Sequence, residues 1–127
     1  MSQPANWNHL TDPIQLEAIN EASANTPVLI FKHSTTCGIS GLAHNRLKRG
    51  WDIPEDTLPF YYLDLHQFRP ISNEVARQYD VQHESPQVLL VSNGTCSYHS
   101  SHLDISIEGI KAALASISTN DEAASGE

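Results

Sequence analysis

The sequence has few basic residues and no long apolar run. Seven Lys and Arg residues stand against fifteen Asp and Glu residues, which gives a formal net charge of −8. Nucleic acids and anionic membrane surfaces attract clusters of Lys and Arg, so neither is a predicted partner. No stretch approaches the roughly 18 apolar residues of a membrane-spanning helix. Residues 1–10 lack a basic segment followed by an apolar run, so we expect no signal peptide and a cytoplasmic protein.

Cysteine is also scarce, with Cys37 and Cys96 as the two examples. In a reducing compartment they are expected to be free thiols, and a structural disulfide between them is the less favoured alternative. His99 and His102 are closely spaced, but no pair of Cys-x-x-Cys or His-x-x-x-His ligands accompanies them, so no metal site is predicted. For Cys96 we favour a structural role, with an auxiliary resolving role as the alternative.

What the sequence does contain is a cysteine between a predicted strand and a predicted helix. The apolar, β-branched run at residues 27–31 is typical of a strand buried on both faces of a sheet. Apolar residues then recur at helical spacing from Ile39 to Leu47, and Gly50 ends the pattern. Cys37 therefore lies at a helix N-terminus, where free N–H groups and the helix dipole favour a thiolate over a thiol.

The residue three positions after Cys37 is Ser40, where many thiol oxidoreductases have a second cysteine. A serine cannot resolve a mixed disulfide, so the motif Cys-Gly-Ile-Ser predicts a monothiol centre. We expect the Ser40 hydroxyl to donate a hydrogen bond to the Cys37 sulfur. His33 could also lie near Cys37 and lower the pKa of its thiol, but strand alternation favours a structural position for this histidine.

Acidic residues are missing from the segment between Glu21 and Asp52. Four basic residues lie within this segment: Lys32, Arg46, Lys48 and Arg49. The last three complement the C-terminus of the predicted helix, and only Lys32 is expected close to Cys37. A second interpretation is that the segment steers an anionic thiol of low molecular weight toward the site.

The remaining pattern predicts one α/β domain at residues 1–118 and a disordered acidic tail at residues 119–127. A helix opens at Thr11-Asp12-Pro13, a second strand lies at residues 59–65, and another helix begins near Pro70. Asn93-Gly94 between two short strands predicts a hairpin, and a last helix runs from about Asp104 to Ile117. This order resembles the thioredoxin-like arrangement, a mixed four-stranded sheet flanked by helices.

Pro86 stands directly before the first strand of the hairpin, in Glu84-Ser85-Pro86-Gln87. Proline cannot donate to a strand ladder, and a cis peptide bond is one of the few ways to place it there. Thioredoxin-like proteins carry a cis-proline opposite the cysteine loop, so we expect a cis bond that leaves the backbone at Ser85 free to pair with substrate.

The segments 32–40, 85–87 and 101–105 together resemble the YtxJ-type monothiol bacilliredoxins, and the likeness covers nearly all of residues 8–118. That family is thioredoxin-like and cytoplasmic, and it is implicated in removing bacillithiol from protein mixed disulfides. The family more often has proline after the cysteine, where this chain has Gly38. The motif is also similar to the Cys-Gly-Phe-Ser of monothiol glutaredoxins, which bind glutathione and can share a [2Fe-2S] cluster between subunits.

The resemblance implies a mechanism and a set of site residues. Cys37 would be the nucleophile, Ser40 would assist it, and Thr36, Gly38, Ile39, Ser85 and Pro86 would bind the substrate. The partners would be S-thiolated client proteins, with bacillithiol or glutathione as co-substrate and no tightly bound cofactor. A cluster carrier and a non-catalytic thioredoxin-like binding module are the alternatives.

Overall fold

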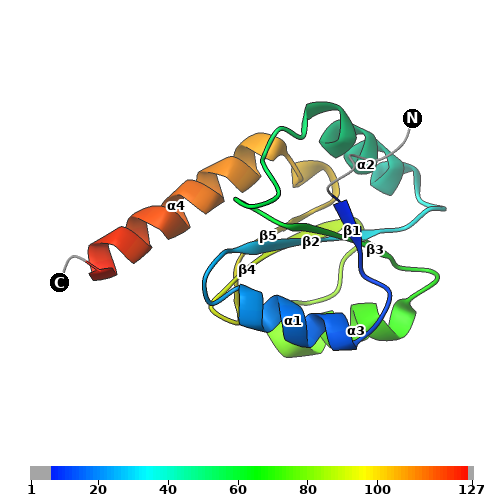
Figure 1. Cartoon of the computed structure of the whole chain (residues 1–127). Helices are drawn as coiled ribbons and strands as arrows, with labels where there is room; N and C mark the ends of the chain where they lie inside the picture. Colours follow the sequence, from blue (N-terminus) through cyan, green and yellow to red (C-terminus); the bar gives the residue numbers. More distant parts are fainter. Residues whose placement is uncertain (1–6, 126–127) are drawn as a thin grey trace.

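A computed structural model of the chain describes residues 7–125 (Figure 1). The elements in chain order are β1 (Trp7–His9), α1 (Ile14–Ala22), β2 (Val28–His33), α2 (Gly38–Gly50), β3 (Phe60–Asp64), α3 (Arg69–Tyr79), β4 (Gln87–Ser92), β5 (Thr95–Ser101), a 3₁₀ helix η1 (His102–Asp104) and α4 (Ile107–Ser125). The strands form one mixed sheet in the order β1-β3-β2-β4-β5. Strand β2 pairs in parallel with β3 and antiparallel with β4, so it is the central strand.

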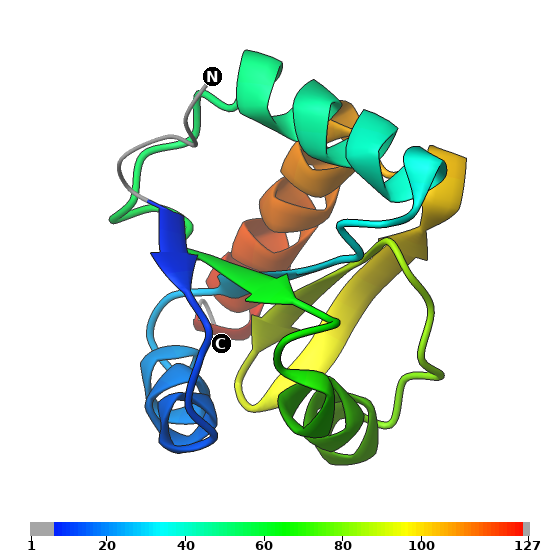
Figure 2. The same cartoon turned by 90° about the vertical axis from the view of Figure 1, so that its right-hand side faces the viewer.

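The helices cover the sheet on both faces, as Figures 1 and 2 show. Helices α2 and α4 lie on one face, over a core that includes Leu29, Phe31 and Leu47. Helices α1 and α3 lie on the other face, over a core that includes Ile30 and Val75. Neighbouring residues of β2 thus point to opposite faces, and all six are buried, as the continuous apolar run predicts.

The sheet has five strands, so the prediction of four was wrong in number. The additional strand is β1, which pairs in parallel with β3 at the edge of the sheet. Trp7 is buried there and stacks on Phe60 with ring centroids 3.8 Å apart. A strand of three residues is too short to show an alternating pattern, so its stability comes from this aromatic packing rather than from local propensity.

The C-terminal part of the chain also differs from the prediction. The hairpin forms at Asn93-Gly94, and both residues have the positive φ that its turn requires. Helix α4 then begins at Ile107 rather than near Asp104, because η1 occupies residues 102–104. It continues to Ser125, so helix extends over most of the segment for which the sequence predicts a disordered tail.

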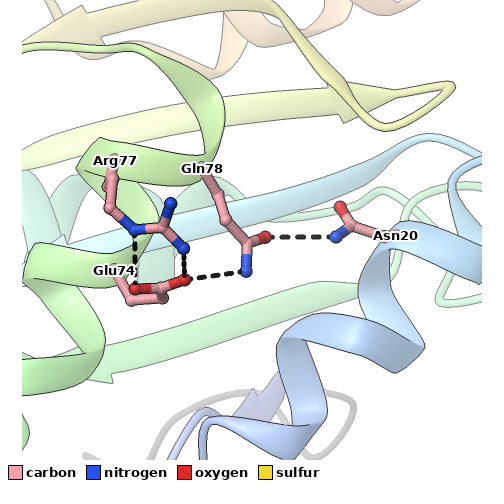
Figure 3. A network of polar contacts seen from close by, with 4 residues as sticks. All are labelled: Asn20, Glu74, Arg77 and Gln78. Atoms are coloured by element: carbon pink, nitrogen blue, oxygen red, sulfur yellow. Dashed lines mark hydrogen bonds and ion pairs between the residues drawn. The ribbon is translucent and has the colours of Figure 1, made fainter.

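A polar network joins α1 and α3 on the lower face of the molecule (Figure 3). Arg77 pairs with Glu74, and Gln78 Nε2 donates to Glu74 Oε2 over 3.2 Å. Asn20 Nδ2 of α1 donates to Gln78 Oε1 over 3.1 Å. The contacts are exposed, so each contributes little to stability, and within this network the link between the two helices is the contact of Asn20 with Gln78.

Candidate active site

The site is built where β2 ends and α2 begins, in the connection coloured cyan in Figure 1. Cys37 is the N-cap residue of α2, with extended backbone angles of φ −103° and ψ 124°. Its carbonyl accepts a hydrogen bond from Gly41 N over 3.0 Å, which starts the helix. The thiol is free and half-buried, and Thr36, Gly38 and Ile39 around it are exposed. A substrate can therefore approach the sulfur from solvent at the end of the helix where N–H groups lack partners.

The Ser40 hydroxyl makes its hydrogen bonds to His33 and Ser34 and not to the sulfur, so the predicted hydrogen bond to Cys37 was wrong. The Ser40 side chain is fully buried on the face of α2 that meets the sheet. Its Oγ accepts a hydrogen bond from Ser34 N over 2.9 Å and lies 2.8 Å from His33 Nδ1. The hydroxyl thus binds His33 at the end of β2 and Ser34 at the start of the loop. These two hydrogen bonds join α2 to the sheet near Cys37.

His33 occupies the buried structural position that strand alternation favours. Its ring lies against His44 of α2, with centroids 4.5 Å apart, and against Tyr62 of β3 at 5.6 Å. Burial lowers the pKa of both imidazoles, and for His44 the pKa falls to about 4, with the charges of His33 and Lys48 adding to the effect. Both rings are therefore neutral near neutral pH, which removes His33 as a cationic partner of the thiolate.

His66 belongs to the site, although no motif in the sequence pointed to it. It follows β3, and its Nε2 lies 2.8 Å from Ser34 Oγ and 2.8 Å from Thr36 Oγ1. Asp64 Oδ1 accepts from His66 N over 3.1 Å and holds the turn that carries the ring. The available signal was topological, because the ends of parallel strands such as β2 and β3 meet at one edge of a sheet.

The loop before β4 reaches the same edge from the other side. Strand β4 is antiparallel to β2, and Gln87 at its start pairs with Lys32 near the end of β2. Ser85 and Pro86 therefore lie beside the cysteine loop, and the Ser85–Pro86 peptide bond is cis. Pro86 O accepts from His102 N over 3.0 Å, which ties this loop to η1.

Lys32 lies on the opposite face of the sheet from α2. Its side chain is fully buried, and its Nζ lies 3.3 Å from His83 Nδ1. Burial, with a smaller contribution from the charge of Arg69, lowers the pKa of Lys32 to about 8. The hydrogen-bond partner of the Lys32 ammonium is therefore His83, in the loop before Pro86, and not Cys37.

Cys96 lies at the other end of the sheet from Cys37. It pairs with Val91, which in turn pairs with Val28 at the beginning of β2, whereas Cys37 follows the end of β2. A strand of six residues spans roughly 16 Å, and a disulfide needs Cα atoms within about 7 Å. The disulfide alternative is thus contradicted, and both thiols are free. Cys96 Sγ donates to Tyr98 O over 3.3 Å, and burial raises the pKa of its thiol.

Within residues 7–125 no three His, Cys, Asp or Glu side chains gather where they could hold a metal ion. Over the same residues, none of the helices has the length and apolar character needed to cross a membrane.

Comparison with known proteins agrees with this geometry. The family model of monothiol bacilliredoxin BrxC matches residues 8–110. One similar solved structure is that of a proposed oxidoreductase with a thioredoxin fold. Its sequence is 31% identical, the match covers 85% of this chain and 93% of that one, and the TM-score is 0.73. A thioredoxin from Malassezia sympodialis is 18% identical over 91% of this chain and 94% of its own, with a TM-score of 0.69. A thioredoxin mutant from Halobacterium salinarum is 16% identical over the same shares, with a TM-score of 0.65.

The family match spans most of the chain, and the structural neighbours share its sheet and helices. A thiol redox function accords with both, and with an accessible cysteine at a helix N-terminus. The chain belongs to the monothiol bacilliredoxin family and has the thioredoxin fold.

Proposed function

We propose that the protein is a monothiol thiol–disulfide oxidoreductase that removes bacillithiol, or a similar thiol of low molecular weight, from protein mixed disulfides. The observation that carries the proposal is the isolation of Cys37. Its thiol is reachable at the N-terminus of α2, Ser40 stands where a resolving cysteine would be, and Cys96 lies at the opposite end of the sheet. A single reactive thiol of this kind must pass its disulfide to an outside thiol.

The exchange proceeds in two balanced steps. The Cys37 thiolate attacks the bacillithiol sulfur, a new S–S bond forms, and the bond to the client sulfur breaks. The client cysteine leaves with the electron pair as a thiolate and takes a proton from solvent. A second low-molecular-weight thiol then attacks the bound bacillithiol, which releases a symmetric or mixed disulfide and returns Cys37 as a thiolate.

The residues around Cys37 have separate tasks in this proposal. Backbone N–H groups at Gly38 and Ile39 stabilise negative charge on the attacking sulfur, since they belong to the unpaired first turn of α2. Thr36 borders the sulfur on the loop side. The backbone at Ser85 and Pro86 is where the bound thiol would pair. Ser40 acts indirectly, because its hydroxyl holds α2 in place.

The test is the intact mass of the protein after separate incubation with bacillithiol disulfide and glutathione disulfide. We expect one bacillithiol adduct per chain, which is absent in Cys37→Ser and present in the matched variant Cys96→Ser. A stronger adduct with glutathione would change the assigned thiol and leave the mechanism intact. Failure to form either adduct would overturn the proposal and favour a binding module without turnover.

A bacillithiolated protein gives the second readout, since adduct formation alone does not show turnover. Release of bacillithiol from the client should depend on Cys37 and on added free thiol, and it should continue for many cycles. The client proteins and a cytoplasmic setting belong to the same proposal.

A further inference from the structure

One exposed stripe of α2 runs from the nucleophile toward the far end of the helix. Ile39, Leu42, Arg46 and Arg49 are spaced by three or four residues, so they share one face of the helix. Ile39 is 42% exposed and Leu42 is 57% exposed, although both are large and apolar. Leu103 of η1, which contacts α2, is 59% exposed. The stripe is therefore apolar beside Cys37 and basic farther along.

The basic end of this α2 stripe lies over a groove between α2 and the start of α4. Its volume is about 540 Å³, and Leu42, Arg46, Arg49, Ile107 and Glu108 are among its lining residues. Gly50 and Ile107 also line the groove and lie close together, because a Cβ atom at Gly50 would be only 2.7 Å from Ile107 Cδ1. Arg46 Nη1 donates to Ile105 O over 3.3 Å, which fixes the guanidinium while its other N–H groups are available to a partner.

The charge of the α2 stripe contrasts with that of the whole chain. The protein has a formal net charge of −8, yet no acidic residue occurs between Glu21 and Asp52. Two guanidinium groups line the groove against the single carboxylate of Glu108. Complementarity of potential sets which partner is accepted and how fast it arrives, so this face repels basic partners and attracts acidic ones.

We infer that the α2 stripe is the docking surface for client proteins, and that it selects clients with acidic residues at a set distance from the thiolated cysteine. This inference rests on the proposed function. Arg46 and Arg49 lie nine and twelve residues after Cys37, which corresponds to roughly 13–18 Å along the helix. An extended client segment covers about 3.3 Å per residue, so its acidic side chains should lie four to five residues from its cysteine.

The experiment uses three bacillithiolated peptides that differ only at the fourth and fifth residues after cysteine, with Glu, Gln or Lys at both positions. For the wild-type protein we expect kcat/KM for the Glu peptide to exceed that for the Gln peptide about threefold to tenfold, and the Lys peptide to be slowest. The preference should shrink as salt is raised from 0.05 M to 0.3 M, because exposed charges are screened.

Three variants separate docking from chemistry. The double variant Arg46→Gln/Arg49→Gln should react with all three peptides at the rate of the Gln peptide. Arg77→Gln changes the charge of α3 on the opposite face of the sheet, where Arg77 pairs with Glu74, so it should keep the wild-type preference. Leu42→Gln should slow all three peptides alike, since it alters the apolar end of the α2 stripe.

Bacillithiol disulfide serves as the substrate that has no docking segment. Its rate should be equal in wild type and in every variant, which also shows that the variants are folded. If wild type reacts with bacillithiol disulfide but treats the three peptides alike, the docking surface is refuted and the proposed function stands. If wild type reacts with neither bacillithiol disulfide nor glutathione disulfide, the proposed function itself fails.

Discussion

The Ser40 hydroxyl lies 2.8 Å from His33 Nδ1, so the fourth residue of the Cys-Gly-Ile-Ser motif joins helix α2 to strand β2. The same oxygen accepts the backbone N–H of Ser34. Both partners are buried, and burial makes an unpaired polar group costly. Ser40 therefore holds the cysteine loop in position, whereas a cysteine at the same position would resolve the mixed disulfide.

Replacement of this serine tests that role. Ser40→Ala leaves Ser34 N and His33 Nδ1 without their partner, so the free energy of unfolding should fall by about 1–3 kcal/mol. The Cys37 adduct with bacillithiol disulfide should still form. Urea denaturation measures the first effect and intact mass the second. Ser97→Ala, at an exposed serine of β5, should change neither. A loss of adduct without a loss of stability would show that the hydroxyl acts on the sulfur after all.

His66 should matter more for exchange than for folding. Its ring is exposed but holds two hydroxyls of the loop that precedes Cys37. His66→Ala should lower kcat/KM severalfold and raise the hydrogen exchange of residues 34–37, with a change in stability within about 1 kcal/mol. The control is His99→Ala, at an exposed histidine of β5. Unchanged kinetics together with unchanged loop exchange would refute the positioning role.

The buried imidazole of His33 and the half-buried imidazole of His44 should make the protein sensitive to acid. In the unfolded chain His44 takes up a proton near its ordinary pKa of 6.5, whereas in the folded protein its pKa is lowered to about 4. The unfolded state then binds more protons between these values, so the free energy of unfolding falls as the pH drops from 6.5 toward 4. For His44 alone the loss by pH 4.5 is about 2 kcal/mol, and His33 adds to it in the same direction.

His44→Phe isolates the contribution of this residue, because phenylalanine keeps the aromatic packing against Trp7 and Tyr62. Denaturation at pH 7 and pH 4.5 should show a smaller loss in the variant than in wild type. Equal losses in the two proteins would mean that His44 is already protonated when folded.

Cys96 should stay unreactive while Cys37 reacts. Burial raises the pKa of the Cys96 thiol, so a smaller fraction is thiolate at neutral pH. A limiting amount of iodoacetamide should therefore label Cys37 first, as peptide mapping can show. Oxidation with diamide should give dimers or mixed disulfides through Cys37. An internal disulfide, detected as a chain that has lost two hydrogens, would contradict the placement of the two thiols at opposite ends of the sheet.

The sequence predicted what depends on local pattern. The apolar run at residues 27–31, the turn at Asn93-Gly94 and the helix after Cys37 are each specified by neighbouring residues. The strand, turn and helix were therefore found close to where the structure has them. Strand β1 was missed because three residues carry no periodicity. Its pairing depends on Phe60, which is far away in the chain. His66 was missed for the same reason, since only the folded sheet brings it to Ser34.

The partners of Ser40 and Lys32 show a different limit. Sequence spacing placed each residue near Cys37, but it did not say which neighbour each polar atom would choose. Ser40 has a closer partner in His33, and Lys32 points to the face that carries His83. Competition among several buried groups decides such contacts, and that competition exists only once the core is packed.

The last two residues of β2, Lys32 and His33, face opposite sides of the sheet, and this limits how the gene can change. Inserting or deleting one codon within Val28–His33 would move the side chains of Lys32 and His33 each to the opposite face of the sheet. An ammonium group would then lie beneath α2, and an imidazole would lie beneath the loop that carries Pro86. Related genes should therefore differ in length on either side of this strand and almost never inside it. In a library of single-codon insertions selected for soluble expression, insertions within Val28–His33 should be nearly absent.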